Sequence, residues 1–552
     1  MRETVNGGAL ENLEKSAEGA RQTSSVESLR QKDRADNTQK SVCFSLEPLK
    51  IFQWFLFIHF KEACMQAITD FLLPIVQKIN AYLSDYILIF LLVGVGLFYT
   101  IRTKFVQVRC FGEGMKKVFG NLSLKGGKRH GGLSSFQALA TAIAAQVGTG
   151  NIVGACGAIL IGGPGAIFWM WVIAFFGMAT IYAEAVLAQE TRIVKEDGSV
   201  LGGPVYYIKK AFNNGFGKFL AVFFAIALTL ALGFMGSMVQ SNSIASAISS
   251  AAPAIDGWVV GIILAALCAF IFLGGVQRIA SVAEKIVPLM AVLYLLIGIV
   301  VLGFNITAVP ATFALIFKSA FVPQAIIGGA FGAGIKAAIS QGAKRGLFSN
   351  EAGMGSTPHA HAQASVEKPH DQGVVAMIGV FIDTFVVLTI TALVVISTLY
   401  TGEGPLSHLA VINADTAALA GITKNNLMQT ALGQIFGQIA GNILVAVCLT
   451  FFAFTTIISW NFFGKQNVQY LFGKHSKVAV AIYSVLAIAF IFLGSCFDPD
   501  LVWELADMFN NIMVIPNVLA LFFLSKFVVK AVKSKKSKKD GVSVDAGQIE
   551  NN

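Results

Sequence analysis

The stretch AQVGTGNIVGACGAILIGGPG, residues 145–165, places polar and flexible residues inside an otherwise apolar run. Gly148, Thr149, Gly150 and Asn151 interrupt that run. In a membrane interior a helix opens only where other polar groups replace its lost backbone hydrogen bonds. A helix broken here would offer N–H groups suited to a carboxylate and carbonyl groups suited to a bare cation. The alternative is that the glycines only allow two helices to approach closely, a role for which Thr149 and Asn151 are not needed.

Ionisable side chains inside other apolar runs are further candidates, because charge at membrane depth is costly. Asp383 in IGVFIDTFVVL is the most isolated of them. Its carboxylate is suited to carrying a proton or another functional charge, or alternatively to pairing with a neighbouring lysine or amide. For Lys336 the favoured interpretation is that its amine reaches the membrane surface. Glu184 and Asp507 are expected nearer the ends of their helices, where water or basic loops partner them.

Several polar and aromatic side chains each admit two interpretations. Thr455 and Thr456 in FAFTTIISW either face a hard cation or bond back to the preceding helical turn. Gln240 is compatible with a hydrogen bond between helices. Trp460 is compatible with the aromatic belt at a membrane surface.

The string KRGLFSNEAGMGSTPHAHA, residues 344–362, is expected at the cytoplasmic end of a predicted membrane helix near 324–346, which is the sixth core helix when the helices after the leading one are counted. Asn350 and Glu351 are candidates for an inner-gate network with Arg345. His359 and His361 lie two residues apart with no third ligand nearby, which argues against a metal site.

The elements that must position these residues are membrane helices. The chain has 552 residues, of which 55% are hydrophobic and 13% charged, whereas soluble domains carry about 25% charged residues. Apolar windows of about 20 residues predict an all-α polytopic membrane protein with eleven spans. They lie near 86–103, 135–161, 164–189, 217–249, 257–275, 282–304, 324–346, 373–399, 429–460, 477–494 and 501–525. One leading helix followed by five and five predicts an inverted repeat, because an odd number of spans per half reverses the topology.

The predicted organisation has five parts. They are a disordered N-terminal extension (1–64), an amphipathic lead-in with the leading transmembrane helix (65–104), a first five-helix repeat (135–304), a second five-helix repeat (324–525) and a basic cytoplasmic tail (526–552). Lysine and arginine concentrate in alternate loops, and the opposite loops keep only Lys318 and Lys424. This asymmetry predicts a cytoplasmic C-terminus. It also explains the net charge of +10 without nucleic acid.

Several function classes fit poorly. The sequence has no GxxxxGK[ST] loop, so an ATP-driven transporter would need a separate subunit. No such ATP-binding subunit is expected. The spans hold no nucleophile–base pair or metal cluster, which argues against an enzyme. A membrane amino-acid receptor would need a signalling partner.

Several strings together resemble the alanine/glycine:cation symporter family, the sodium:alanine symporters. They are FQALATAIAAQVGTGNIVG, GGPGAIFWMWVIAFFGMATIYAEAVLA, GGPVYYI, MVQSNSIA, KRGLFSNEAGMGS and FAFTTIISW, and the likeness runs from about residue 75 to about residue 525. The resemblance implies a leucine-transporter-like fold, with the five-plus-five inverted repeat after one extra helix. It also implies transport of small neutral amino acids with Na⁺ or sometimes H⁺.

The resemblance assigns roles to particular residues. It implies that the N–H groups of Thr149 and Gly150 hold the substrate carboxylate, and that Asn151, Gln240 and Trp460 help to line the substrate site. It implies a sodium environment built from Ala144, Gln146, Val147, Asn151, Asp383, Thr455 and Thr456.

We therefore expect a monomeric secondary transporter in the cell (cytoplasmic or inner) membrane that imports alanine and glycine with sodium by alternating access. No cofactor is expected beyond the co-transported sodium ion. The alternatives are a sodium-coupled glutamine importer and a proton-coupled amino-acid symporter, and the receptor is the least favoured.

Overall fold

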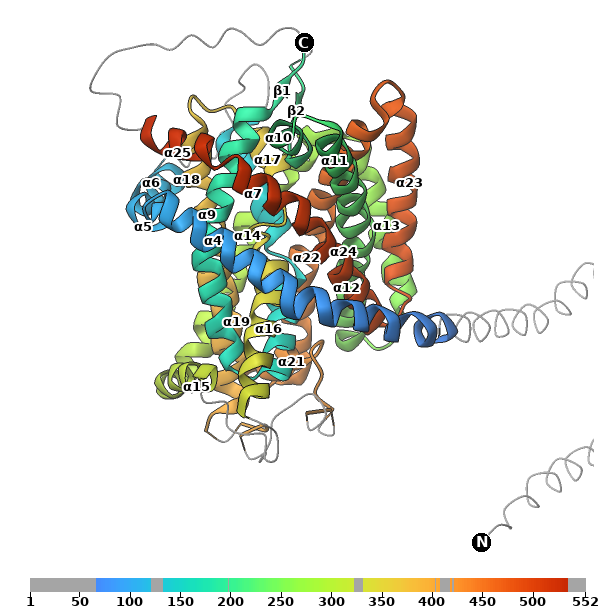
Figure 1. Cartoon of the computed structure of the whole chain (residues 1–552). Coiled ribbons are helices and arrows are strands. Elements are labelled where there is room, and N and C mark those ends of the chain that lie inside the picture. Colours follow the sequence, from blue (N-terminus) through green and yellow to red (C-terminus); the bar gives the residue numbers. More distant parts are fainter. Residues whose placement is uncertain are drawn as a thin grey trace, which may run out of the picture. The chain divides into compact units, whose positions relative to one another are not determined.

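The computed structural model describes residues 66–120, 133–196, 198–321, 331–402, 404–407, 417–418 and 421–534. The predicted N-terminal extension, 1–64, lies outside the described residues, as does 535–552 of the tail. The chain divides into two units, 1–68 and 69–552. The second unit is almost entirely helical (Figure 1).

The first half of this unit contains the elements up to α14. In chain order they are η1 (Leu83–Leu88), α4 (Ile89–Arg102), α5 (Val106–Arg109), α6 (Phe111–Phe119), α7 (Ser135–Gln146), η2 (Gly150–Gly154), α8 (Ala155–Gly162), α9 (Gly165–Thr191), β1 (Ile193–Val194), β2 (Val200–Leu201), α10 (Pro204–Ala211), α11 (Gly215–Leu228), η3 (Thr229–Gly236), α12 (Ser237–Ala251), α13 (Gly257–Phe272) and α14 (Gly275–Phe304). The two strands pair antiparallel, with Ile193 opposite Leu201.

The second half begins directly after α14, at Ile306. Its elements are η4 (Ile306–Ala308), α15 (Val309–Phe321), α16 (Phe331–Asn350), α17 (Pro358–Ala362), α18 (Pro369–Val380), η5 (Phe381–Leu388), α19 (Thr389–Val395), η6 (Ile396–Tyr400), α21 (Leu427–Phe436), α22 (Gln438–Phe472), η7 (Gly473–His475), α23 (Ser476–Gly494), α24 (Pro499–Phe523) and α25 (Ser525–Ser534). The helix α25 occupies the start of the predicted tail, and Val528 and Ala531 on it are buried.

Where the structure describes them, the predicted spans lie largely in helix, but length and hydropathy alone identify fewer spans. Among the described residues seven helices are long and apolar enough to cross a membrane, or eight if the bent pair α7/α8 is one span. The helix α13 has only 16 residues, and α22 with α23 counts as one apolar stretch, Gln438–Gly494. The predicted span 429–460 is divided between α21 and α22 at Gly437, whose φ is 83°. The count of eleven stays a prediction.

Packing divides the helices into two groups. In one group α9 packs against α16 and α18, and in the other α12 packs against α22 and α23. The helix α7 contacts α18 of the first group and α22 of the second, so it connects the groups, and α14 packs on both α7 and α22.

The first core helix is broken where its sequence predicts. A capping box at Ser134 and Gln137 starts α7, and Val147, with ψ of 86°, ends it. The chain resumes helical form at Gly150 as the π-helical turn η2, and the two parts are bent by 47°.

A second broken helix lies in the string 344–362. The helix α16 ends at Asn350, and the chain is non-helical until α17 begins at Pro358. Gly353 and Gly355 have φ values of 93° and 81°, a left-handed conformation that glycine adopts without strain. The string therefore lies at the end of α16, as predicted, but its middle forms a buried break.

The two broken helices run antiparallel. The helix α8 packs on α16, and α7 packs on α17. Leu133, just before α7, exchanges backbone hydrogen bonds with Gln363 and Ser365, just after α17. In Figure 1 α7 and α17 lie toward the end that carries α10 and α25, whereas α16 lies toward the end with α15 and α21. Both breaks consequently meet inside the bundle.

Candidate functional site

Glycines allow the two breaks to touch. A Cβ atom at Gly150 would lie 3.1 Å from both the Phe348 ring and the Ser349 Cα atom. The Gln146 amide crosses between the breaks and donates to the Asn350 carbonyl over 2.7 Å. The glycines therefore serve close packing as well as the helix break, and the two interpretations of this motif are compatible.

A carboxylate lies beside this contact. Asp383 is fully buried. Its oxygens accept hydrogen bonds from Asn151 Nδ2 over 2.7 Å, Ser349 Oγ over 2.9 Å and Thr384 Oγ1 over 2.8 Å. The neighbouring amide predicted as one alternative partner is thus Asn151.

No ion pair within the described part of the chain involves Asp383. Burying an ionised carboxylate without a positive partner is unfavourable. Oxygen ligands from carboxylates, amides and hydroxyls suit a hard cation. This cluster is therefore chemically suited to sodium or to a proton.

The neighbouring threonines of α22 face different helices. The Thr456 hydroxyl lies 2.9 Å from the Ala144 carbonyl of α7 and 3.0 Å from the Phe452 carbonyl of its own preceding turn, and a Cβ atom at Gly148 would lie 2.5 Å from that hydroxyl. The Thr455 hydroxyl bonds back to the Phe451 carbonyl over 3.0 Å and lies 3.6 Å from the sulfur of Met290 on α14. The structure thus brings Thr456, but not Thr455, against the first break.

Polar atoms at the first break lack protein partners. The Thr149 N–H donates to Gln240 Oε1 over 3.1 Å. Three buried atoms form no hydrogen bond with any residue that the structure describes, namely the other amide atom, Gln240 Nε2, together with Thr149 Oγ1 and Gln146 Oε1. Buried polar groups are rarely left unpaired in folded proteins. Three such atoms beside one helix break mark it as a place for a polar ligand.

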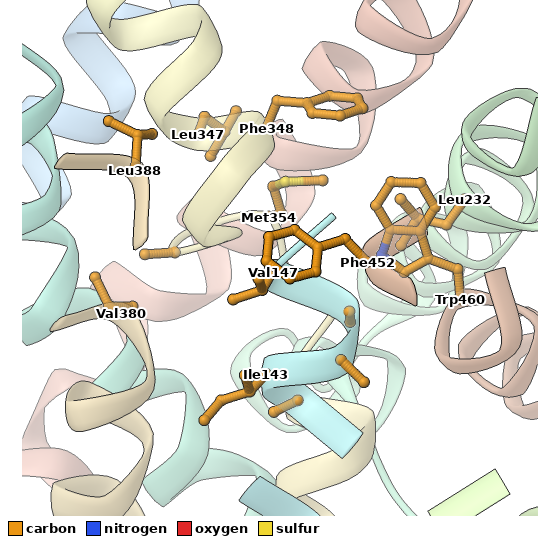
Figure 2. Packing of buried hydrophobic residues seen from close by; sticks show 14 of the residues in the cluster. Ile143, Val147, Leu232, Leu347, Phe348, Met354, Val380, Leu388, Phe452 and Trp460 are labelled. Atoms are coloured by element: carbon orange, nitrogen blue, oxygen red, sulfur yellow. The ribbon is translucent and has the colours of Figure 1, made fainter. Parts of the chain in front are cut away.

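Trp460 belongs to the interior and not to a surface belt, since only 1% of it is exposed. Its indole N–H donates to Glu351 Oε1 over 2.5 Å. Its ring packs edge-on against Phe348, with 5.9 Å between the centroids. A Cβ atom at Gly236 would lie 2.5 Å from the indole, so glycine is needed there. Figure 2 shows Phe348, Phe452 and Trp460 in the same close-up as Val147 of the first break.

Glu184 is a residue whose role sequence reasoning missed. It was expected near a helix end beside water or basic loops, and that expectation is wrong, because the side chain is fully buried. Its oxygens accept from the N–H groups of Gly353 and Gly355 over 3.1 Å and 3.0 Å and from Asn517 over 2.7 Å. Glu184 therefore holds the second break in place. The only signal in the sequence was a glutamate inside an apolar run.

Arg345 does not join Asn350 and Glu351, contrary to prediction. Its guanidinium pairs with Asp507 over 3.1 Å and lies 4.8 Å above the Trp503 ring. Lys344 also pairs with Asp507, over 2.8 Å. The basic partners expected for Asp507 thus come from the helix α16 and not from a loop.

Three further predicted residues have separate partners. Asn467 Nδ2 lies 2.8 Å from His359 Nε2, and Gln372 Nε2 lies 2.9 Å from His361 Nδ1. The two imidazoles do not share a site. The exposed Lys336 places its amine 4.8 Å above the Tyr86 ring.

Comparison with known proteins agrees with this architecture. The model of the sodium:alanine symporter family matches residues 69–546. The chain is 40% identical over 461 residues to the sodium/alanine symporter AgcS of Methanococcus maripaludis, covering 83% of this chain and 96% of the relative. It is 39% identical over 472 residues to a Bacillus subtilis protein named "Probable sodium/glutamine symporter GlnT", covering 85% of this chain and 92% of the relative.

A solved structure of MhsT in complex with L-phenylalanine has a similar fold. The TM-score is 0.51 at 13% identity, and the match covers 73% of this chain and 99% of that chain. MhsT has the leucine-transporter fold, which is the fold predicted for this chain. With the family match over most of its length, the chain belongs to the sodium:alanine symporter family, whose members are sodium-coupled amino-acid transporters and not enzymes.

Proposed function

We propose that this protein imports small neutral amino acids, alanine and glycine, together with Na⁺ across the cell membrane by alternating access. The observation that carries the proposal is the meeting of two broken helices beside a buried carboxylate that pairs with no cationic side chain of the described residues, and beside three buried polar atoms to which no described residue hydrogen-bonds. The protein acts as a monomer with its C-terminus in the cytoplasm.

The amino acid binds at the first break. In the structure the Gln240 side-chain oxygen accepts a hydrogen bond from the Thr149 N–H group. A substrate carboxylate displaces that oxygen and accepts from the same N–H, from Gly150 and from the freed Gln240 Nε2. Charge-assisted hydrogen bonds of this kind are stronger than the neutral bond that they replace.

Side-chain size is limited by aromatic rings. Phe348 contacts Gly150, and Trp460 packs against Phe348. Close-packed protein interiors tolerate few added methylene groups. Glycine and alanine therefore fit where larger side chains require the rings to move.

Sodium binds in two places on the same helix. One set of oxygen ligands comes from the side chains of Asp383, Asn151 and Gln146 and from the Val147 carbonyl. Thr456 and the Ala144 carbonyl supply the other, to which Thr455 contributes only after rotation of its side chain. Asn151 connects ion and substrate, since its Oδ1 accepts from the Gly148 N–H while its Nδ2 donates to Asp383.

This shared residue provides the coupling. An ion that fixes Asn151 also fixes the break on which the substrate binds, and by linkage each ligand strengthens the other. Inward movement of each positive charge gains about 2.3 kcal/mol per 100 mV of membrane potential. The antiparallel broken helices fit two halves of opposite orientation, an arrangement found in many transporters that work by alternating access.

Uptake of labelled alanine into proteoliposomes tests the proposal. Sodium-driven uptake that glycine blocks, and that glutamine does not, would support it. A glutamine importer, favoured by the likeness to GlnT, would instead show competition by glutamine. Uptake driven only by a proton gradient would transfer the coupling role to protonation of Asp383. Alanine binding without uptake under any gradient would refute transport and favour the membrane amino-acid receptor.

A further inference from the structure

Cys110, Glu113 and His370 form a cluster away from the transport site. One ligand atom from each, the Sγ, a carboxylate oxygen and an imidazole nitrogen, lie within 4.8 Å of one another. Cys110 is the residue before α6, and Glu113 follows three residues later on the same helical face. His370 is the second residue of α18. The cluster thus connects two helices distant in sequence.

The histidine is already oriented. Its Nδ1 lies 2.7 Å from the hydroxyl of Tyr182 on α9, and its Nε2 lies 3.5 Å from Glu113 Oε1. Histidines that bind metal usually make a hydrogen bond through their second ring nitrogen, which fixes the ring and the tautomer. Tyr182 is fully buried, so this supporting contact is rigid.

Two neighbouring cationic side chains, Lys117 and Arg109, have partners outside the cluster. Lys117 on α6 pairs with Asp371 over 3.0 Å. Arg109 donates to the backbone carbonyls of Thr103 and Lys104 over 2.7 Å and 2.5 Å. Neither therefore needs to occupy the space between the thiol, the carboxylate and the imidazole.

We propose that Cys110, Glu113 and His370 bind a divalent metal ion of the zinc class. Thiolate, imidazole and carboxylate together suit Zn²⁺, whereas Mg²⁺ and Ca²⁺ prefer oxygen alone. The Glu113 side chain is 25% exposed, which leaves room for water as the fourth ligand. Binding releases the thiol proton. The Nδ1–H group of His370 donates a hydrogen bond to the Tyr182 oxygen, while Nε2 holds the metal.

The metal ties α6 to the start of α18. The helix α18 contacts both α6 and α9, and α18 continues directly into η5, which carries Asp383. On the side predicted to be cytoplasmic, thiols stay reduced and available as ligands. The metal is thus a structural clamp that is separate from the sodium sites.

The test uses the full chain, purified in detergent with a metal-free reductant. Zn²⁺ affinity is measured by competition with a chromophoric chelator, and Co²⁺ replaces Zn²⁺ for absorption spectra. We expect one tight site per chain and a thiolate-to-cobalt charge-transfer band. Cys110→Ser should abolish the band and Tyr182→Phe should weaken Zn²⁺ binding about 10-fold, while both still elute as folded protein.

The matched control is Cys496→Ser, because Cys496 is a partly buried thiol outside the cluster. It should leave both the affinity and the band unchanged. Glu113→Gln, at a partly exposed position, should weaken Zn²⁺ binding without loss of fold. Equal Zn²⁺ binding by the parent and by Cys110→Ser, or a cobalt spectrum without the charge-transfer band, would overturn the proposal.

Discussion

Replacement of Asp383 by asparagine is the sharpest test of the proposed sodium site. Asparagine has nearly the same shape, and its amide oxygen can still accept the hydrogen bond from Asn151. Its N–H₂ group can donate to the hydroxyl oxygens of Ser349 and Thr384, which at present donate to the carboxylate. The substitution therefore removes one negative charge while the hydrogen-bonded frame is kept.

The expected loss follows from electrostatics. A sodium ion about 4 Å from the carboxylate gains about 4 kcal/mol at an effective dielectric constant near 20. Each 1.4 kcal/mol changes an equilibrium constant about tenfold. Because no ion pair of the described residues compensates Asp383, the variant should need roughly 10²- to 10³-fold more Na⁺ for half-maximal alanine uptake.

Alanine uptake into proteoliposomes at stepped Na⁺ concentrations measures this shift, and Na⁺-dependent quenching of tryptophan fluorescence checks binding separately. Ser349→Ala is the control, since it removes hydrogen bonds to the same carboxylate but keeps the charge. It should cost only about 1 kcal/mol, or about fivefold in Na⁺. A half-saturating Na⁺ concentration for Asp383→Asn within about threefold of the parent would refute the reasoning.

Three further predictions concern single side chains. Thr456→Val removes the hydroxyl that bonds to the Ala144 carbonyl and should raise the Na⁺ requirement for uptake about tenfold. Thr455→Val, one residue away, should change it less than about threefold, and equal effects would show that both hydroxyls bind sodium or that neither does. Glu184→Leu strands two backbone N–H groups, at about 1–3 kcal/mol each, and should lower the thermal unfolding temperature in detergent; an unchanged temperature would contradict its role at the second break. Trp460→Leu should allow glutamine to compete with labelled alanine, whereas unchanged exclusion of glutamine would mean that this ring does not limit substrate size.

The amino-acid sequence by itself determined the helical membrane architecture and the first break. Long apolar runs require helices in lipid, and GTGN inside one of them is unfavourable unless the helix opens. These are local properties, so residues 145–165 reveal them without a partner. The predicted spans accordingly lie largely in helix wherever the structure describes them.

Only the tertiary structure decided which side chains meet. Successive residues on a helix point about 100° apart, and the rotation of α22 directs Thr456 toward α7 and Thr455 toward α14. The second break also depends on a distant residue, since Glu184 on α9 holds the N–H groups of Gly353 and Gly355. Free N–H groups are favourable in a buried segment only when an acceptor is placed against them, and that acceptor lies about 170 residues earlier in the chain.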